Sequence, residues 1–503
     1  MLTTLKAIAI ILLLSSSIII KAQSGKPLFM PEIKYDNATF SGKITGLIPV
    51  DSVFNPINLS FNNVVTADRM SYDVPVKKDG TFSLSIPVQC ISFAVAQSDY
   101  YENIICLVPG EETRLEISFD SDQKKHVKLI NSLGLSADDA VNMMEVINSA
   151  LDDTTATTKK MAPEMITPEI YGQQVISRLT KCLKLIENTD KLSGAAKQIA
   201  KSETKAWFIS SFMFDYDKWL RLDYINYYKT SSVPKDFQPQ IPGRSYYSFL
   251  KSLNLEDPAN FSASFYSNVL QLILSNDTLD IPAIGDTPVD DWLVKVKEIL
   301  KDDIGIGTAQ FYDLLAGNAF AKQFNEVKPL NEIQKKNIIA YFTNKSFANV
   351  LFDENEKVKK IADKSRDANI YRLNESIENI MDTIIFKYKG KVIFVDFWTT
   401  WCAPCLRAMK ESESVKKEFE NKDVVFVYIT NPTSPLKTWE NKILAIQGEQ
   451  YYITIAQWNF LQKIYKINGI PHYLIFNKTG ELKYNQGGFM GNDNMSNLIV
   501  KLL

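Results

Sequence analysis

The sequence predicts a multidomain protein with an N-terminal antiparallel β-sandwich, a central all-α region and a C-terminal α/β domain. Its 503 residues exceed one ordinary domain, and a hydrophobic content of 45% is typical of globular chains. Strand-like alternation, helical spacing and buried apolar strands follow one another along the chain. We expect a signal peptide at 1–22, a β-sandwich domain at 23–130, a helical domain at 131–374 and the α/β domain at 375–503.

The charge balance argues against polyanionic partners. Lys and Arg number 56 against 58 Asp and Glu, which leaves a net charge of −2. Nucleic-acid binding and a basic membrane-contacting face both require clustered positive charge. We therefore expect no nucleic-acid partner.

The N-terminus has the features of an export signal. Lys6 precedes the apolar run Ala7 to Ile20, and Ala22 follows it as a small residue. This run is shorter than the roughly 20 residues that span a bilayer. The alternative is an uncleaved membrane anchor. We expect an exported, periplasmic protein without a stable membrane span in the mature chain.

Short strands dominate the region before residue 130. The turn Lys78-Asp79-Gly80 is a strong hairpin signal, and the residues after it alternate apolar with polar side chains. Strands of this length and spacing are typical of a small antiparallel sandwich. The expected strands are Thr39–Ile48, Ile57–Phe61, Asp68–Val76, Thr81–Val88, Ile104–Val108 and Thr113–Phe119.

Helical periodicity replaces alternation in the central region. Ser136 to Asp139 resembles a helix start, and apolar residues then recur three or four positions apart. The segment Trp207 to Tyr228 is rich in aromatic residues. These residues indicate either an ordinary helical core or a surface that binds a partner or ligand.

The C-terminal region alternates strands and helices. Its strongest strand is Lys391–Phe397, which after the lysine is apolar except for one aspartate, as in a parallel sheet. The other expected elements are a short strand at Ile384–Phe386, a helix from Cys402, strand Asp423–Ile429, helices Pro435–Ile446 and Asn459–Tyr465, strands Tyr473–Phe476 and Glu481–Asn485, and helix Asn494–Leu503.

Cys402 and Cys405 form a candidate redox pair. Three positions separate them, about one helical turn, so both thiols can face the same side. Unpaired N–H groups at the helix start favour a thiolate at Cys402, and Cys405 is placed to resolve a mixed disulfide. Among the other cysteines, Cys182 is expected to be a buried free thiol, and a Cys90–Cys106 bridge stays open.

Asp396 is a candidate acid–base group. It lies inside the apolar strand, six residues before Cys402. Burial disfavours the ionised carboxylate and should raise its pKa. Such a group could take the proton of Cys405 during resolution. The alternative is a strand-end aspartate that reaches solvent.

Gly469-Ile470-Pro471 directly precedes a strand. A cis peptide at Pro471 would place the Ile470 backbone beside the sulfurs, where it could pair with an extended substrate. Trp401 could contact substrate or shield the site, or only pack against the domain. His472 could lower a thiol pKa, or be hydrogen-bonded elsewhere in its strand.

A C-x-x-C pair is also half of a typical zinc site. Cys182 is isolated and the only histidines are His126 and His472, so a second pair of ligands is missing. We expect neither a metal nor a cofactor.

The motif WCAPC after VDFWTT, with GIP about 65 residues later, resembles the thioredoxin superfamily, in particular the exported oxidoreductases typified by TlpA and ResA. The resemblance covers Glu375 to Leu503 and implies a thioredoxin-like fold there. It implies that Cys402 is the nucleophile, Cys405 the resolving thiol and Pro471 the cis-proline. Asp396 falls where thioredoxin has its buried acid.

The chain departs from this pattern at several positions. The TlpA and ResA branch often carries Glu and Pro where this chain has Ala408 and Lys410, and ResA-like proteins tend to have Asn in place of Asp396. The proton acceptor therefore resembles that of thioredoxin, on the strand. Thr399 fits a peroxiredoxin pattern, but Val395 replaces its expected proline.

The sequence thus predicts an exported thiol–disulfide oxidoreductase that reduces protein disulfides through Cys402 and Cys405. Its expected partners are protein disulfide substrates and an unidentified electron donor. Two alternatives stay open. One is a binding or scaffold protein whose redox domain serves one dedicated partner, and the other is a thiol peroxidase.

Overall fold

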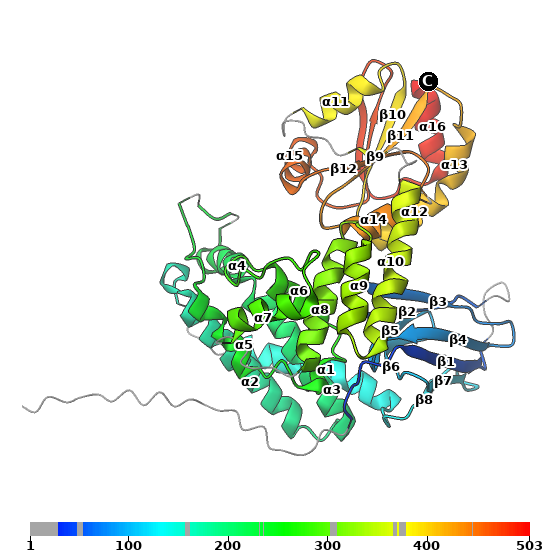
Figure 1. The fold of residues 1–503 in the computed structure, drawn as a ribbon. Helices are drawn as coiled ribbons and strands as arrows, with labels where there is room; N and C mark the ends of the chain where they lie inside the picture. The colour runs from blue at the N-terminus through cyan, green and yellow to red at the C-terminus, as the bar shows by residue number, and fades with distance from the viewer. Residues whose placement is uncertain are drawn as a thin grey trace, which may run out of the picture. The chain divides into compact units, whose positions relative to one another are not determined.

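The computed structural model describes residues 29–47, 54–155, 161–230, 232–234, 236–301, 309–365, 370–371, 379–444 and 446–503. The predicted signal peptide lies outside these residues. The chain divides into two compact units, which are Met1–Ala283 with Asp290–Ala316, and Ile284–Val289 with Gly317–Leu503. Figure 1 labels their elements.

Two four-stranded sheets form the start of the first unit. The first has the order β4-β1-β7-β8 and the second β3-β2-β5-β6. All six predicted strands are present, and β5 and β8 were not predicted. The bounds are β1 Asp36–Thr45, β2 Ile57–Asn62, β3 Arg69–Val74, β4 Thr81–Val88, β5 Ser92–Gln97, β6 Glu102–Leu107, β7 Glu112–Phe119 and β8 Lys125–Ile130.

The expectation of a purely antiparallel arrangement is wrong at one strand pair. β1 pairs with β4 in antiparallel and with β7 in parallel orientation. The reason is the chain path: after β6 the chain leaves the second sheet, turns at Pro109 and Gly110, and enters the first sheet in the direction of β1. Gly110 has a φ of 83°, which a glycine adopts without strain.

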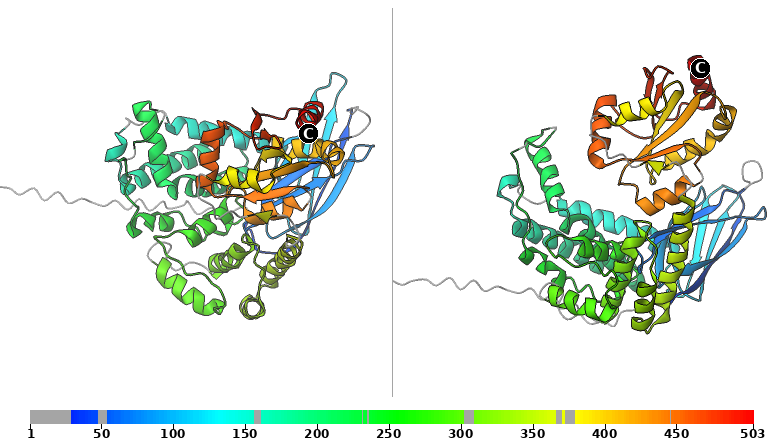
Figure 2. Two further views of the ribbon diagram at one scale, coloured as in Figure 1. Left: turned by 90° about the horizontal axis from the view of Figure 1, so that it is seen from above. Right: turned by 45° about the horizontal axis from the view of Figure 1, so that its top comes forward.

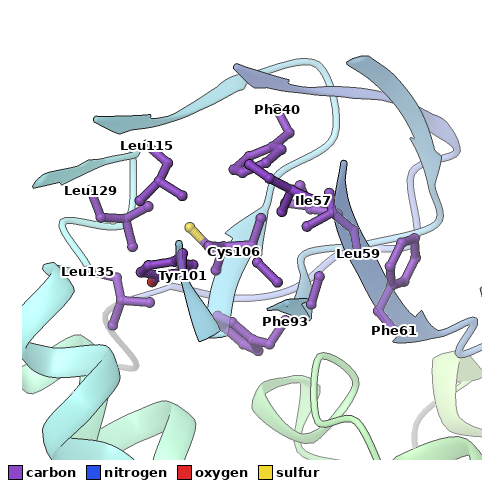
Figure 3. Packing of buried hydrophobic residues seen from close by; sticks show 14 of the residues in the cluster. Phe40, Ile57, Leu59, Phe61, Phe93, Tyr101, Cys106, Leu115, Leu129 and Leu135 are labelled. Carbon is purple, nitrogen blue, oxygen red and sulfur yellow. The ribbon is translucent and has the colours of Figure 1, made fainter. Parts of the chain in front are cut away.

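Both sheets contribute to one hydrophobic core. Figure 3 shows Phe40 and Leu115 of the first sheet packed near Ile57 and Cys106 of the second. Residues of α1 (Ala137–Thr155) and α3 (Gly194–Phe208), such as Met143 and Ile199, belong to the same cluster. The helices therefore complete the core that the sheets begin.

The three cysteines of this unit are buried free thiols. The Cys90 and Cys106 thiols have separate environments, beside the carbonyl of Phe261 and the hydroxyl of Thr113. Burial raises the pKa of each to about 12. The structure therefore contains no Cys90–Cys106 bridge, while Cys182 is a buried thiol as predicted.

Helices make up the rest of the first unit. The π-helix Ile209–Met213 interrupts them, and tyrosine hydroxyls of Tyr171 and Tyr246 donate to its carbonyl groups. The longer helices are α1 Ala137–Thr155, α2 Pro168–Asn188, α3 Gly194–Phe208, α4 Tyr216–Tyr228, α6 Tyr266–Ser275 and α7 Val289–Leu300. The division between the two units falls within α8, Ala309–Phe324.

The aromatic segment divides between the two predicted interpretations. Phe208, Phe212 and Tyr216 are buried core residues. Tyr227 and Tyr228, at the end of α4, are exposed by 38% and 44%. Three of the nine aromatic residues are therefore core, four are half-buried, and the two at the end of the segment lie on the surface.

A six-stranded sheet with the order β14-β13-β10-β11-β12-β9 forms the centre of the second unit. All six residues of β10 are buried between its neighbours β11 and β13. Every predicted strand after residue 390 is present. The bounds are β9 Ile370–Tyr371, β10 Val392–Phe397, β11 Val424–Thr430, β12 Glu449–Tyr452, β13 His472–Phe476 and β14 Leu482–Gly487.

Helices cover both faces of this sheet (Figures 1 and 2). One face packs against α11 and α15, and the other against α13 and α16. The bounds are α9 Glu332–Tyr341, α10 Lys345–Ser365, α11 Ile380–Lys387, α12 Ala403–Glu411, α13 Glu413–Glu418, α14 Leu436–Ile443, α15 Ile455–Tyr465 and α16 Asn492–Leu502.

The predicted strand Ile384–Phe386 is wrong, because these residues belong to α11. Ile380, Met381 and Ile384 are the buried residues of this helix and recur at helical spacing. A short apolar run does not distinguish a strand from a buried helix.

Among the residues that the structure describes, none of the helices combines the length and apolar character needed to cross a bilayer.

Candidate active site

The cysteine pair lies where β10 gives way to α12. Cys402 is the N-cap residue of this helix, and its Sγ accepts a hydrogen bond of 3.2 Å from the Cys405 N–H. The two residues form a disulfide with a Cα–Cα distance of 5.3 Å. Cys402 is 4% exposed and Cys405 is 0% exposed. Only the first sulfur is therefore within reach of an outside group.

A cis peptide lies beside the outer sulfur. The bond between Ile470 and Pro471 is cis, as the sequence predicts. The carbonyl oxygen of Ile470 is 3.8 Å from the Cys402 Sγ. The carbonyl of Pro471 accepts a 2.8 Å hydrogen bond from the Gly488 N–H, which holds the following loop against the proline. The Ile470 backbone thus lies directly next to the disulfide.

Asp396 is buried in β10, with 4% of its surface exposed. In the sheet it stands between Tyr428 of β11 and Tyr473 of β13. Burial raises its pKa to about 7, although the nearby Lys416 acts in the opposite direction. Its Oδ1 has no hydrogen-bond partner among the described residues. The alternative of a solvent-reaching aspartate is therefore wrong.

Asp396 also influences its surroundings. Tyr428 packs in the same cluster as both cysteines, so the carboxyl group lies next to the side chains that enclose them. Burial lowers the pKa of Lys416, on α13, while Asp396 favours its charged form. The two buried groups, one acid and one base, therefore act on each other electrostatically.

Trp401 is exposed by 63%. Its indole Nε1–H donates a 3.1 Å hydrogen bond to the Thr433 hydroxyl. The ring is held at one edge and leaves most of its surface open. The alternative of a tryptophan that only packs against the domain therefore does not hold. The buried neighbour Trp398 has that packing role.

Sequence reasoning did not identify the loop between β11 and α14, which supports the residues before Cys402. The Ser434 hydroxyl accepts a 3.0 Å hydrogen bond from the Thr400 N–H and lies 2.8 Å from the Thr430 hydroxyl. Tyr452 donates to the Ser434 carbonyl at 2.8 Å. In the sequence, the only indication of this supporting loop is the run of polar residues after the apolar strand β11.

His472 is hydrogen-bonded within the sheet. Its Nε2 lies 2.6 Å from the Asn485 Oδ1 of β14. Of the two predicted interpretations, the strand residue bonded elsewhere is the one that the structure shows.

The departures on α12 have a clear structural outcome. Ala408 is 3% exposed, and Lys410 points to solvent. Because alanine is apolar, α12 supplies no carboxyl group at position 408. The buried acid of the site, Asp396, comes from strand β10 and not from α12.

Known proteins resemble the C-terminal region. Residues 390–482 match a family model described as thioredoxin-like. The thiol-disulfide oxidoreductase ResA of Geobacillus kaustophilus is 24% identical over 98 residues, covering 19% of this chain and 54% of the relative. ResA of Halalkalibacterium halodurans is 29% identical over 101 residues, covering 20% and 56%. The chain thus spans about half the length of these curated relatives.

A solved structure from Bacteroides vulgatus, described as a putative thiol-disulfide oxidoreductase, is 25% identical. The match covers 23% of this chain and 82% of that chain, with a TM-score of 0.20. The family match falls on the segment that contains Cys402 and Cys405. The C-terminal region of this chain is therefore a thioredoxin-like domain.

Proposed function

We propose that the protein is an exported thiol–disulfide oxidoreductase that reduces protein disulfides through Cys402 and Cys405. The observation that carries the proposal is the disulfide at the start of α12, with its outer sulfur 3.8 Å from the carbonyl of a cis peptide. A redox pair needs one accessible and one enclosed sulfur, and this pair has both.

The first step is attack by Cys402. In the reduced protein its thiolate displaces one sulfur of a substrate disulfide, so that a mixed disulfide forms and a substrate thiolate leaves. The N–H of Cys405 and the helix N-terminus stabilise the negative charge on Cys402.

The second step is resolution by Cys405. Its thiol gives a proton to the Asp396 carboxylate and its sulfur attacks that of Cys402. The Cys402–Cys405 bond forms while the second substrate thiolate leaves, and two electrons have passed to the substrate. A carboxyl group with a pKa of about 7 can accept and release this proton near neutral pH.

Substrate binding follows from the surface around the sulfur. The backbone of Ile470 can pair with an extended substrate segment, as an added strand would. The exposed face of Trp401 offers an apolar contact on the same site. Protein segments that can extend locally around a cystine are the substrates that fit this surface.

We also propose that the protein is exported and that its two N-terminal sheets form a sandwich. The apolar segment Ala7 to Ile20 would direct the chain out of the cytoplasm, and an unidentified donor would reduce the Cys402–Cys405 disulfide again. The two N-terminal sheets, which share one core, would pack as a β-sandwich.

Insulin reduction in the presence of dithiothreitol tests the activity. The mature chain should accelerate precipitation of the insulin B chain, and Cys402→Ser should not. Equal rates for the two proteins would show that Cys402 does not carry the reaction.

A dedicated partner is the second candidate function. It is favoured by the large first unit and by its exposed tyrosines, Tyr227 and Tyr228. Cys405→Ser should trap mixed disulfides. Many trapped proteins would support a general reductase, and one trapped protein would support a dedicated module.

A further inference from the structure

A pocket of about 680 Å³ opens beside the cis-proline. Its volume falls in the usual range of ligand sites, roughly 300–1,000 Å³. Its walls come from the end of α15, the segment before β13 and the end of β14, and include Asn468, Ile470, His472, Asn485 and Gly487. We call it the His472 pocket.

The His472 pocket shares Ile470 with the surroundings of the reactive sulfur. Ile470 lines it, and the carbonyl of the same residue lies 3.8 Å from the Cys402 Sγ. On the far side, the bond between Gly488 N–H and the Pro471 carbonyl fixes the wall. A substrate residue next to the attacked cysteine would therefore reach this pocket without leaving the site.

The polar groups of the pocket have defined directions. The amide Nδ2 of Asn485 donates to the Tyr465 carbonyl at 3.0 Å, so its Oδ1 is the atom that faces His472. An amide oxygen only accepts, and His472 must donate through Nε2–H. The neutral ring then carries no proton on Nδ1, which is left as an acceptor.

This acceptor lies at the wall of the pocket. A Cβ built on Gly487 would stand 3.4 Å from Nδ1 of His472, so the glycine leaves the nitrogen uncovered. Nδ1 has no hydrogen-bond partner within the described ranges of the chain. A buried ring with one satisfied and one open nitrogen is suited to recognise a hydrogen-bond donor.

We propose that the His472 pocket is a substrate subsite that selects a hydroxyl-bearing residue, Ser or Thr, adjacent to the cysteine that Cys402 attacks. The hydroxyl donates to Nδ1 of His472, and the Asn485 amide keeps the ring in the accepting tautomer. This inference rests on the proposed function and adds a specificity to it.

Symmetrical disulfide dimers of a short single-cysteine peptide provide the probe. One series carries Ser and a matched series carries Ala, directly before or directly after the cysteine. Single-turnover rate constants are measured with the prereduced full chain, and the Ser/Ala ratio is the readout, so that a general change in reactivity cancels. The small disulfide 2-hydroxyethyl disulfide reports whether the redox pair works at all.

We expect the wild-type chain to prefer Ser at one of the two positions by roughly three- to tenfold, the effect of one neutral hydrogen bond. His472→Gln should bring the ratio to about one, because the glutamine NH2 can still donate to Asn485 while its acceptor oxygen lies at the end of the side chain and not at the ring position of Nδ1. Gly487→Ala should do the same by covering Nδ1 with a methyl group while His472 is unchanged.

Gly469→Ala is the matched control. Gly469 also lines the pocket, but an added Cβ there meets no atom within 4 Å, so this variant should retain the Ser preference. A wild-type ratio of one at both positions, or a preference that survives in both His472→Gln and Gly487→Ala, overturns the subsite alone. A wild-type chain that reduces neither the peptides nor the small disulfide overturns the proposed function and the subsite together.

Discussion

Lys437 of α14 forms an ion pair with Glu354 of α10, and both side chains are buried. Glu354 also pairs with Lys357 at 3.0 Å. Burial acts to raise the pKa of Glu354, but the two lysines outweigh it and hold that pKa below its usual value. A helix outside the matched segment 390–482 is thereby joined to α14, which directly follows the loop whose Ser434 hydroxyl accepts from the Thr400 N–H.

Glu354→Gln should destabilise this unit strongly. The substitution removes the carboxylate charge that faces the buried Lys437 ammonium group, and breaking a buried pair on one side costs about 3–5 kcal/mol. Urea unfolding of the full chain, followed by tryptophan fluorescence, measures the loss.

The matched control for that experiment is Glu356→Gln on the same helix. Glu356 pairs with Lys359 at 2.8 Å, but its side chain is 59% exposed. Surface pairs of this kind contribute little, so its unfolding curve should overlay the wild-type curve. Equal losses for the two variants would contradict a special role for the buried pair.

Asp396→Asn should stabilise the protein at alkaline pH. The folded pKa of Asp396 is about 7, raised by burial from the ordinary value of 3.8. The folded protein binds the Asp396 proton more tightly than the unfolded chain does. This contribution to the free energy of unfolding is fully present below pH 3.8 and is lost as the pH rises through 7. The linkage corresponds to about 4 kcal/mol above pH 7, which Asn avoids because it does not ionise.

The measurement is the difference in unfolding free energy between Asp396→Asn and wild type at pH 4, 6 and 8. The difference should grow between the first two values and level off near the last. If this difference in unfolding free energy is the same at all three pH values, burial does not raise the pKa of Asp396. Other titrating groups are common to both proteins and cancel.

Much of the site could be predicted because its chemistry lies in contiguous segments. Cys402, Cys405 and Pro471 occur in short motifs whose geometry follows from a helix start and a strand start. Asp396 could be placed because a single carboxylate interrupts an apolar strand. Residues whose local sequence sets their environment are accessible to this reasoning.

Other features depend on contacts between distant segments. Glu354 and Lys437 are ordinary polar helix residues in the sequence, and only packing of α10 against α14 makes them a buried pair. Ile384 lies in an apolar run that is too short to distinguish helical from strand periodicity. Its packing in the core of the second unit, as part of α11, is not visible in the sequence. The parallel pairing of β1 with β7 depends on the path between two sheets.

Ser434→Ala should weaken the loop before Cys402. The substitution removes the acceptor of the buried Thr400 N–H, and an unsatisfied buried donor costs about 1–3 kcal/mol. Thr433→Ala, one residue earlier, removes only the exposed bond to the Trp401 indole and should change stability less. Urea unfolding compares the two variants, and a larger loss for Thr433→Ala would contradict the supporting role of Ser434.

Asp396→Asn should also separate the two chemical steps. Attack by Cys402 does not use the Asp396 carboxylate, so mixed-disulfide formation should proceed at close to the wild-type rate. Resolution should slow by roughly a hundredfold, because general-base catalysis typically contributes 10²–10⁴-fold. The wild-type resolution rate should rise with pH up to about 7, where Asp396 becomes ionised, and this rise should vanish in the variant. Stopped-flow mixing of the reduced chain with a chromophoric disulfide resolves both phases. An unchanged second phase would show that the Cys405 proton goes elsewhere, since Ala408 leaves α12 without a carboxyl group at that position.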